Sequence, residues 1–147
     1  MMTMTNSQKA QAAKNWLNRN FGLSRQLRSL YRRRMSQTFA NISQYEEGFS
    51  ETVGNRSEAK MLSFAELNQK IEDLERKLLR GDTETKEAID HVENPLFWSL
   101  LRDRYVDRKG WRQIAKSYGY SEQHIFRIHG QALLEIYPFI PEEVKES

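Results

Sequence analysis

The stretch that decides the fold runs from Asn94 to Ile136 and reads NPLFWSLLRDRYVDRKGWRQIAKSYGYSEQHIFRIHGQALLEI. Two joints interrupt its helical pattern, Arg108-Lys109-Gly110 and Gly119-Tyr120-Ser121. Glycine can adopt the positive φ that ends a helix, and serine can cap the helix that follows. The spacing of the apolar residues predicts helices over 95–105, 111–118 and 121–136. Three short helices joined in this way are typical of a helix-turn-helix.

The middle helix of this set is only about two turns long, so it needs longer neighbours to be stable. Each helix carries one apolar face, and three such faces can close a small core. On the third helix the inward positions are Ile125, Ile128, Ala132, Leu133 and Ile136. Its opposite face is therefore free to contact a partner.

The outward positions of the second and third helices carry side chains suited to DNA. Arg can bind guanine through two hydrogen bonds, Gln can pair with adenine, Glu can accept from cytosine, and Phe can pack on a thymine methyl. Arg112 and Lys116 lie one turn apart on the middle helix and suit phosphates, which a helix N-terminus also favours. The residues expected to contact DNA are Arg112, Gln113, Lys116, Ser121, Glu122, Gln123, Phe126, Arg127 and Gln131.

A plainer interpretation is a three-helix core with an ordinary charged surface. Against it, residues 95–131 contain seven Lys/Arg and only three Asp/Glu. A basic surface beside two short joined helices favours the nucleic-acid interpretation.

Several short motifs recur in the same order in a known family. They are Arg104-Tyr105, Trp111-Arg112-Gln113-Ile114-Ala115, Gly119-Tyr120-Ser121, Arg127-Ile128-His129 and Ala132-Leu133. Together they resemble region 4 of bacterial sigma factors, and more closely the C-terminal domain of ArpU/RinA-type regulators of late genes in phages and prophages of Gram-positive bacteria. Two positions depart from that pattern, because Gly110 replaces the usual Ser or Thr cap and Arg112 replaces a common acidic residue.

The resemblance implies a sequence-specific transcriptional regulator that binds double-stranded DNA. In the sigma relatives, the face matching Glu122, Gln123, Phe126 and Arg127 enters the major groove of the minus-35 element. In such a regulator the N-terminal helices would either build an oligomer or contact bacterial RNA polymerase.

Charge is sorted along the chain. Residues 1–43 hold eight Lys/Arg and no acid, residues 44–94 hold seven against thirteen, and residues 95–147 hold eight against seven. The Arg32-Arg33-Arg34 run can either bind phosphates or form ion pairs with the acidic segment that follows it.

The spacing of apolar residues before Asn94 predicts a helical hairpin ahead of the helix-turn-helix, so the expected fold class is all-α. Helices are expected over 9–19 and 23–42, with a break at Gly22, followed by a mobile loop over 44–58. A heptad seam then contains Phe64, Leu67, Ile71, Leu74, Leu78, Thr85, Ala88 and Val92, interrupted at Gly81-Asp82. Its partner is either residues 23–42 or the same seam in a second chain, a homodimer through 64–92. We expect a hairpin or oligomerisation module over 1–93 and a DNA-binding domain over 94–147.

Enzymatic features are missing from the sequence. There is no cysteine, none of the three histidines pairs with another at metal-ligand spacing, and no nucleophile motif or phosphate loop occurs. His129 is expected to pack or to form a hydrogen bond. No apolar run approaches the length of a membrane span. We therefore expect a cytoplasmic protein without cofactor, metal or enzymatic activity.

Two other functions fit a chain of this kind. Phage small terminase subunits also combine a helix-turn-helix with helical hairpins, although they usually carry the DNA module first, whereas here it comes last. The fold can also be recruited to bind a host protein.

Overall fold

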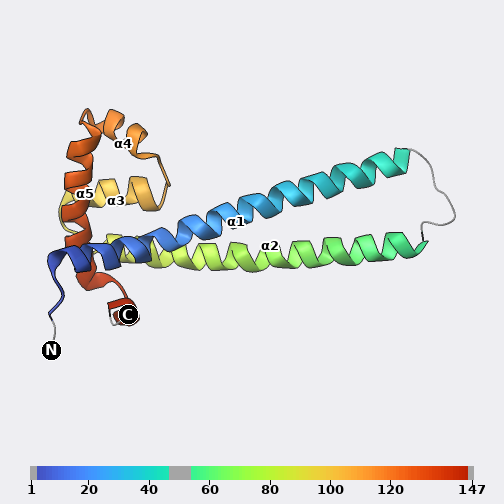
Figure 1. The fold of residues 1–147 in the computed structure, drawn as a ribbon, viewed down its shortest axis with the longest axis horizontal. Helices are drawn as coiled ribbons and strands as arrows, with labels where there is room; N and C mark the ends of the chain where they lie inside the picture. Colours follow the sequence, from blue (N-terminus) through green and yellow to red (C-terminus); the bar gives the residue numbers. More distant parts are fainter. Residues whose placement is uncertain (1–2, 47–53, 146–147) are drawn as a thin grey trace. The chain divides into compact units, whose positions relative to one another are not determined.

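The computed structural model describes residues 3–46 and 54–145, and the regular structure in these residues is entirely helical (Figure 1). The elements are α1 (Asn6–Glu46), α2 (Gly54–Ile89), α3 (Pro95–Tyr105), α4 (Trp111–Tyr118), α5 (Glu122–Ile136), η2 (Tyr137–Phe139) and α6 (Glu142–Lys145). The predicted all-α class is confirmed. The bounds of α3, α4 and α5 agree with the predicted helices to within one residue.

The first helix is longer than expected. The predicted break at Gly22 is wrong, because α1 continues through it to Glu46. One glycine inside a helix costs about 1 kcal/mol, and buried leucines on either side of it, Leu17 and Leu27, stabilise the helix. Of the loop expected over 44–58, residues 47–53 lie outside the described residues, and the rest is helical.

The second helix also passes through its predicted interruption at Gly81-Asp82. Gly81 is buried, and a β-carbon added there would overlap the side-chain oxygen of Asn20 on α1. The glycine therefore does not end the helix. It allows α1 to approach α2 closely.

The chain forms two compact units, to which α1 and α2 both contribute. Unit 1 consists of Met1–Phe21 and Arg80–Ser147, and unit 2 is Gly22–Leu79. This division does not follow the boundary expected at Asn94. The main core of unit 1 takes half of its buried residues from before that position, namely Ala13, Trp16, Leu17, Ala88, Ile89 and Val92.

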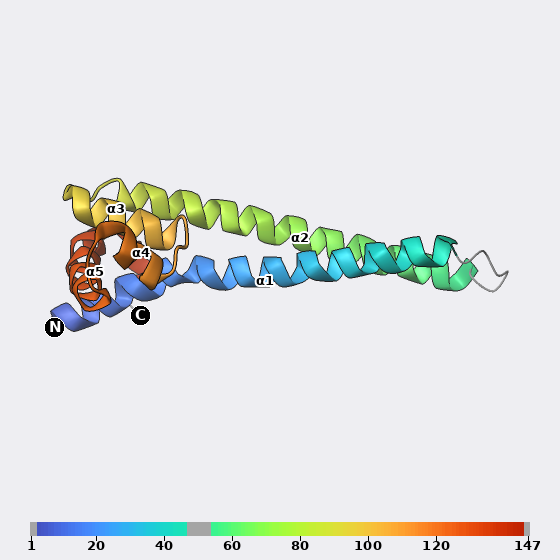
Figure 2. The same cartoon turned by 90° about the horizontal axis from the view of Figure 1, so that it is seen from above.

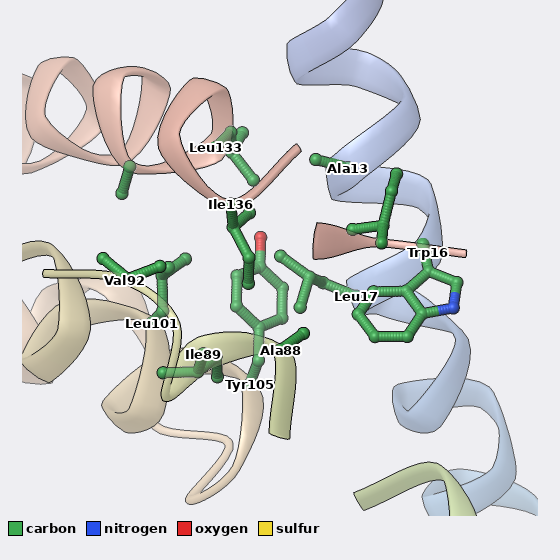
Figure 3. Packing of buried hydrophobic residues seen from close by; sticks show 12 residues of the cluster. Ala13, Trp16, Leu17, Ala88, Ile89, Val92, Leu101, Tyr105, Leu133 and Ile136 are labelled. Atoms are coloured by element: carbon green, nitrogen blue, oxygen red, sulfur yellow. The ribbon is translucent and has the colours of Figure 1, made fainter. Parts of the chain in front are cut away.

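Figure 3 shows how this core is built around the ring of Tyr105, with Leu17 and Ile136 beside it. A second, smaller core of unit 1 joins α3, α4 and α5 through Leu100, Ile114, Ala115, Ile125 and Ile128. The cores are adjacent because neighbouring residues of α3, Leu100 and Leu101, belong one to each.

In unit 2, α1 and α2 run side by side in opposite directions (Figures 1 and 2). Leu27 of α1 is buried against Leu67 and Ile71 of α2, and the half-buried Leu30, Leu74 and Leu78 complete the contact. The heptad seam is thus covered by α1 of the same chain. Arg32 and Arg33 are exposed, and no ion pair with a described residue involves the run 32–34. Ion pairing with the acidic helix, one of the two alternatives for this run, is thus not seen among the described residues.

The C-terminal segment contains a short helix, α6. Lys145 closes this turn by donating to the carbonyl of Pro138 and to Glu142. Ile140 is buried in the main core of unit 1, and Phe139 stacks on His91 at 4.8 Å between ring centroids. Ile140 and the half-buried Tyr137 thus cover the end of the core.

Candidate nucleic-acid interface

The turn between α4 and α5 has the geometry expected from Gly119-Tyr120-Ser121. Gly119 adopts a φ of 71°, and its amide donates to the last carbonyls of α4. Ser121 Oγ accepts from the amide of His124 at 3.1 Å and so caps α5. Ser121 thus has the capping role expected from its sequence, and its hydroxyl hydrogen is still able to donate to an acceptor.

The joint between α3 and α4 is held by arginines whose roles the sequence did not reveal. Arg108 has a positive φ of 55°, and its guanidinium forms two hydrogen bonds with Asp82 of α2, at 2.8 and 3.1 Å. Arg104 Nη1 donates to the carbonyl of Lys109 at 2.9 Å. Gly110 provides no side-chain cap, so these contacts define where α4 begins.

The residues expected to contact DNA are all exposed. On α5 these are Glu122, Gln123, Phe126, Arg127 and Gln131, and on α4 and the turn they are Arg112, Gln113, Lys116 and Ser121. The inward face of α5 is buried as predicted, from Ile125 to Ile136. Arg112 is 95% exposed and approaches Glu122 at 3.7 Å, an ion pair too solvated to restrain it strongly.

A series of aromatic ring contacts connects the exposed face of α5 to the core. Phe126 makes an edge contact with Trp111 at 5.3 Å, and Trp111 makes another with His129 at 4.5 Å. The Tyr105 hydroxyl lies 2.6 Å from His129 Nε2 in the core. Phe126 is thus partly exposed yet held against α4, so this ring can present a defined apolar surface to a partner.

Burial controls the protonation of the Tyr105–His129 pair. It raises the pKa of Tyr105, and burial, assisted by the positive charges of Lys14 and Arg104, lowers the pKa of His129 to about 4. His129 is therefore neutral at neutral pH, and its Nε2 can accept a hydrogen bond from the Tyr105 hydroxyl. This pair links α3 to α5, which agrees with the packed or hydrogen-bonded role predicted for His129.

The C-terminal half of α4 is tied to α3 by a polar cluster. Tyr118 donates to Asp103 Oδ2 at 2.9 Å, Ser99 Oγ lies 2.6 Å from the Tyr118 hydroxyl, and Lys109 pairs with Asp103 at 3.3 Å. Tyr120 stacks beside Tyr118 and is 41% exposed. This exposed ring at the turn was not among the predicted contact residues, although its place in the Gly-Tyr-Ser joint could have indicated it.

The described residues contain no cluster of three or more His, Cys, Asp or Glu side chains that could hold a metal ion. Within the same residues, no helix is both long and apolar enough to cross a membrane. The interface itself offers hydrogen-bonding, charged and apolar side chains. These suit recognition of a surface.

Comparison with family models, with curated proteins and with solved structures finds no match for this chain. The function is therefore inferred from α3, α4 and α5 themselves.

Proposed function

We propose that the chain is a sequence-specific DNA-binding regulator of transcription, in which α5 lies in the major groove of double-stranded DNA. The observation that carries this proposal is the division of α5 into two faces. One face is buried from Ile125 to Ile136, and the other exposes Gln123, Phe126, Arg127 and Gln131. B-DNA admits a helix into its major groove, and these side-chain types match the groups that base edges present there.

The residues divide into two roles. Gln123, Arg127 and Gln131 form hydrogen bonds with base edges, while Phe126, supported by Trp111, packs on a thymine methyl. Arg112 and Lys116 of α4 bind phosphates and set the position of α5 along the duplex. Glu122 accepts from cytosine and can release Arg112 for a phosphate, because their pairing is weak.

A promoter is the DNA target that the resemblance to sigma region 4 supports. The motifs that carry this resemblance lie on α3, α4, α5 and the two joints between them. In this proposal the regulator acts on late genes of a phage or prophage and contacts the host RNA polymerase.

The decisive experiment compares Arg127→Ala with Lys116→Ala by selecting preferred sites from a random DNA pool. Both residues are exposed, so neither change should alter the free energy of unfolding by more than a few tenths of a kcal/mol. Arg127→Ala should remove about 1–3 kcal/mol of preference at a single base position. Lys116→Ala should weaken binding to all sequences equally and reduce its salt dependence.

The unaltered chain should also bind DNA with a salt dependence set by roughly four to six phosphate contacts per protomer. Failure to select any preferred site, or an affinity independent of salt, would remove α5 from DNA recognition. The same exposed face would then be assigned to a protein partner.

A further inference from the structure

Unit 2 carries a second helical face that nothing in the described chain covers. On α1 it contains Arg25, Arg28, Arg32, Met35, Phe39 and Ile42, at alternating steps of three and four residues. This is the spacing of a heptad seam. All six side chains are exposed, with Phe39 at 66% and Met35 at 63%. The seam is distinct from the buried one, which uses Leu27 and Leu30.

A matching row lies on α2 and contains Met61, Ala65, Asn68, Glu72 and Glu75, again at alternating steps of four and three. Both rows follow one residue after the buried positions, as Arg28 follows Leu27 on α1 and Asn68 follows Leu67 on α2, so in an antiparallel pair they face the same side of unit 2. Asn68 of the α2 row also accepts a hydrogen bond from Arg34 of α1 at 3.4 Å. We call the two rows together the second seam.

The second seam is divided along its length in the same way on both helices. Its apolar half contains Met35, Phe39 and Ile42 of α1 with Met61 and Ala65 of α2. Its charged half contains Arg25, Arg28 and Arg32 of α1 with Glu72 and Glu75 of α2. No ion pair between these arginines and glutamates occurs among the described residues. Their charges therefore remain available to another surface.

We propose that the second seam binds the same seam of a second copy of this chain, forming a four-helix dimer of unit 2. In this dimer α1 of each copy packs on α2 of the other, and both copies point in the same direction. Apolar residues then meet apolar residues, while Arg28 and Arg32 of one copy meet Glu75 and Glu72 of the other. In a two-fold dimer with the copies reversed, α1 would pack on α1 of the other copy and the arginines would face Phe39 and Ile42, which gives them no partner.

Charge complementarity within one surface is what identifies a second copy as the occupant. A two-fold dimer brings the same patch together twice, so that patch must complement itself. The second seam does so, because its arginines and glutamates lie on different helices at matching levels. This inference concerns unit 2 alone and does not depend on the proposed DNA binding.

The test is sedimentation equilibrium on the full chain and on two charge-reversed variants. One carries Arg28→Glu with Arg32→Glu, and the other carries Glu72→Arg with Glu75→Arg. We expect the parent to dimerise and each variant alone to dimerise at least about tenfold more weakly. In such a variant, like charges meet at both symmetry-related contacts between α1 and α2. An equimolar mixture of the variants should restore dimers, since every contact in the mixed dimer joins opposite charges.

A second pair of variants tests the apolar half. Phe39→Glu should dissociate the dimer, while Leu62→Glu, at an equally exposed site on another face of α2, should leave it intact. Arg33→Glu is the corresponding charge control, because Arg33 is exposed outside the second seam. Circular dichroism should show unchanged helix content in all of these variants.

Three results would overturn the proposal: a parent that stays monomeric at every concentration, a mixture of reversed variants that remains monomeric, or equal weakening by Phe39→Glu and Leu62→Glu. Failure of DNA binding in these variants bears only on the proposed function. The two ideas are therefore tested separately.

Discussion

Units 1 and 2 are built from the same two long helices but differ in how much of each helix they bury. Unit 1 covers the ends of α1 and α2 with α3, α4 and α5, and its cores include fully buried leucines and isoleucines from several helices. In unit 2 the buried side chains among the described residues are Leu27, Leu67 and Ile71. Two helices packed along one seam leave most of their surface exposed, so one pair makes a small core.

This difference shows that helix length alone says little about local stability. The part of α1 in unit 1 is held by aromatic contacts and hydrogen bonds, including Arg19 to Gly81 and Asn20 to Thr85. Its part in unit 2 has few such contacts among the described residues. Unit 2 should therefore open more easily than unit 1 and gain most from a second copy.

The largest expected effect comes from cutting the chain at Asn94. A fragment of residues 94–147 lacks Ala13, Trp16, Leu17, Ala88, Ile89 and Val92, half of the main core. We expect this fragment to lose cooperative thermal unfolding, measured by circular dichroism, whereas the full chain retains it. A sharp transition for the fragment would show that α3, α4 and α5 fold by themselves and that the boundary expected from the sequence is the better one.

The next effect compares one buried residue in each unit. Leu101→Ala in unit 1 should cost about 2–5 kcal/mol, and Ile71→Ala in unit 2 should fall near the low end of that range because the thinner core can relax. All three tryptophans, Trp16, Trp98 and Trp111, belong to unit 1. In a denaturant titration, Leu101→Ala should therefore lower the unfolding midpoint reported by tryptophan fluorescence. Ile71→Ala should lower mainly the midpoint reported by circular dichroism. Equal shifts in both signals for both variants would mean that the units unfold together.

The sequence predicted the local structure of α3, α4 and α5 well. Helical spacing, Gly119 and Ser121 each act over a few residues, so their effects can be recognised without a structure. The same local reasoning failed at Gly22 and Gly81. There, packing against distant residues outweighs the low helix propensity of glycine, and no nearby residue reveals that packing.

The exposed residues of the interface were also predictable, because helical periodicity separates the two faces of α5. The contacts that hold these residues in place were not predictable. Arg108 reaches Asp82, and Tyr105 reaches His129, across distances in sequence that no spacing rule connects. Likewise, the sequence could not decide whether the predicted heptad seam of α2 is covered by α1 or by a second chain, since either partner could bury it.

A smaller effect should distinguish the units by pH. Burial holds the pKa of His129 at about 4, below its ordinary value of 6.5, so protonation favours the unfolded state. The contribution of neutral His129 to the free energy of unfolding is fully present above pH 6.5 and is lost as the pH falls through 4. Its upper limit is about 3 kcal/mol. Denaturant titrations by tryptophan fluorescence at several pH values should show this loss in the parent and less of it in His129→Gln. His91→Gln serves as the control because His91 is exposed. If both variants follow the parent, unit 1 owes its acid sensitivity to other groups.

The smallest and most selective effect comes from placing alanine at two helical glycines, Gly22 of unit 2 and Gly81 of unit 1. Alanine normally stabilises a helix interior by up to about 1 kcal/mol relative to glycine. A β-carbon at Gly22 would meet nothing within 4 Å, so Gly22→Ala should raise stability by roughly that amount. A β-carbon at Gly81 would overlap the buried Asn20 side chain, so Gly81→Ala should instead cost about 1–3 kcal/mol. Adding Asn20→Ala to Gly81→Ala removes the overlapping atoms, and the double variant should be more stable than the sum of the single changes predicts. Thermal unfolding by circular dichroism measures Gly22→Ala, Gly81→Ala, Asn20→Ala and the double variant against the parent. A stabilising Gly81→Ala would mean that α1 and α2 do not approach closely at Asn20. Unit 1 would then lack the close helix contact that distinguishes it from unit 2.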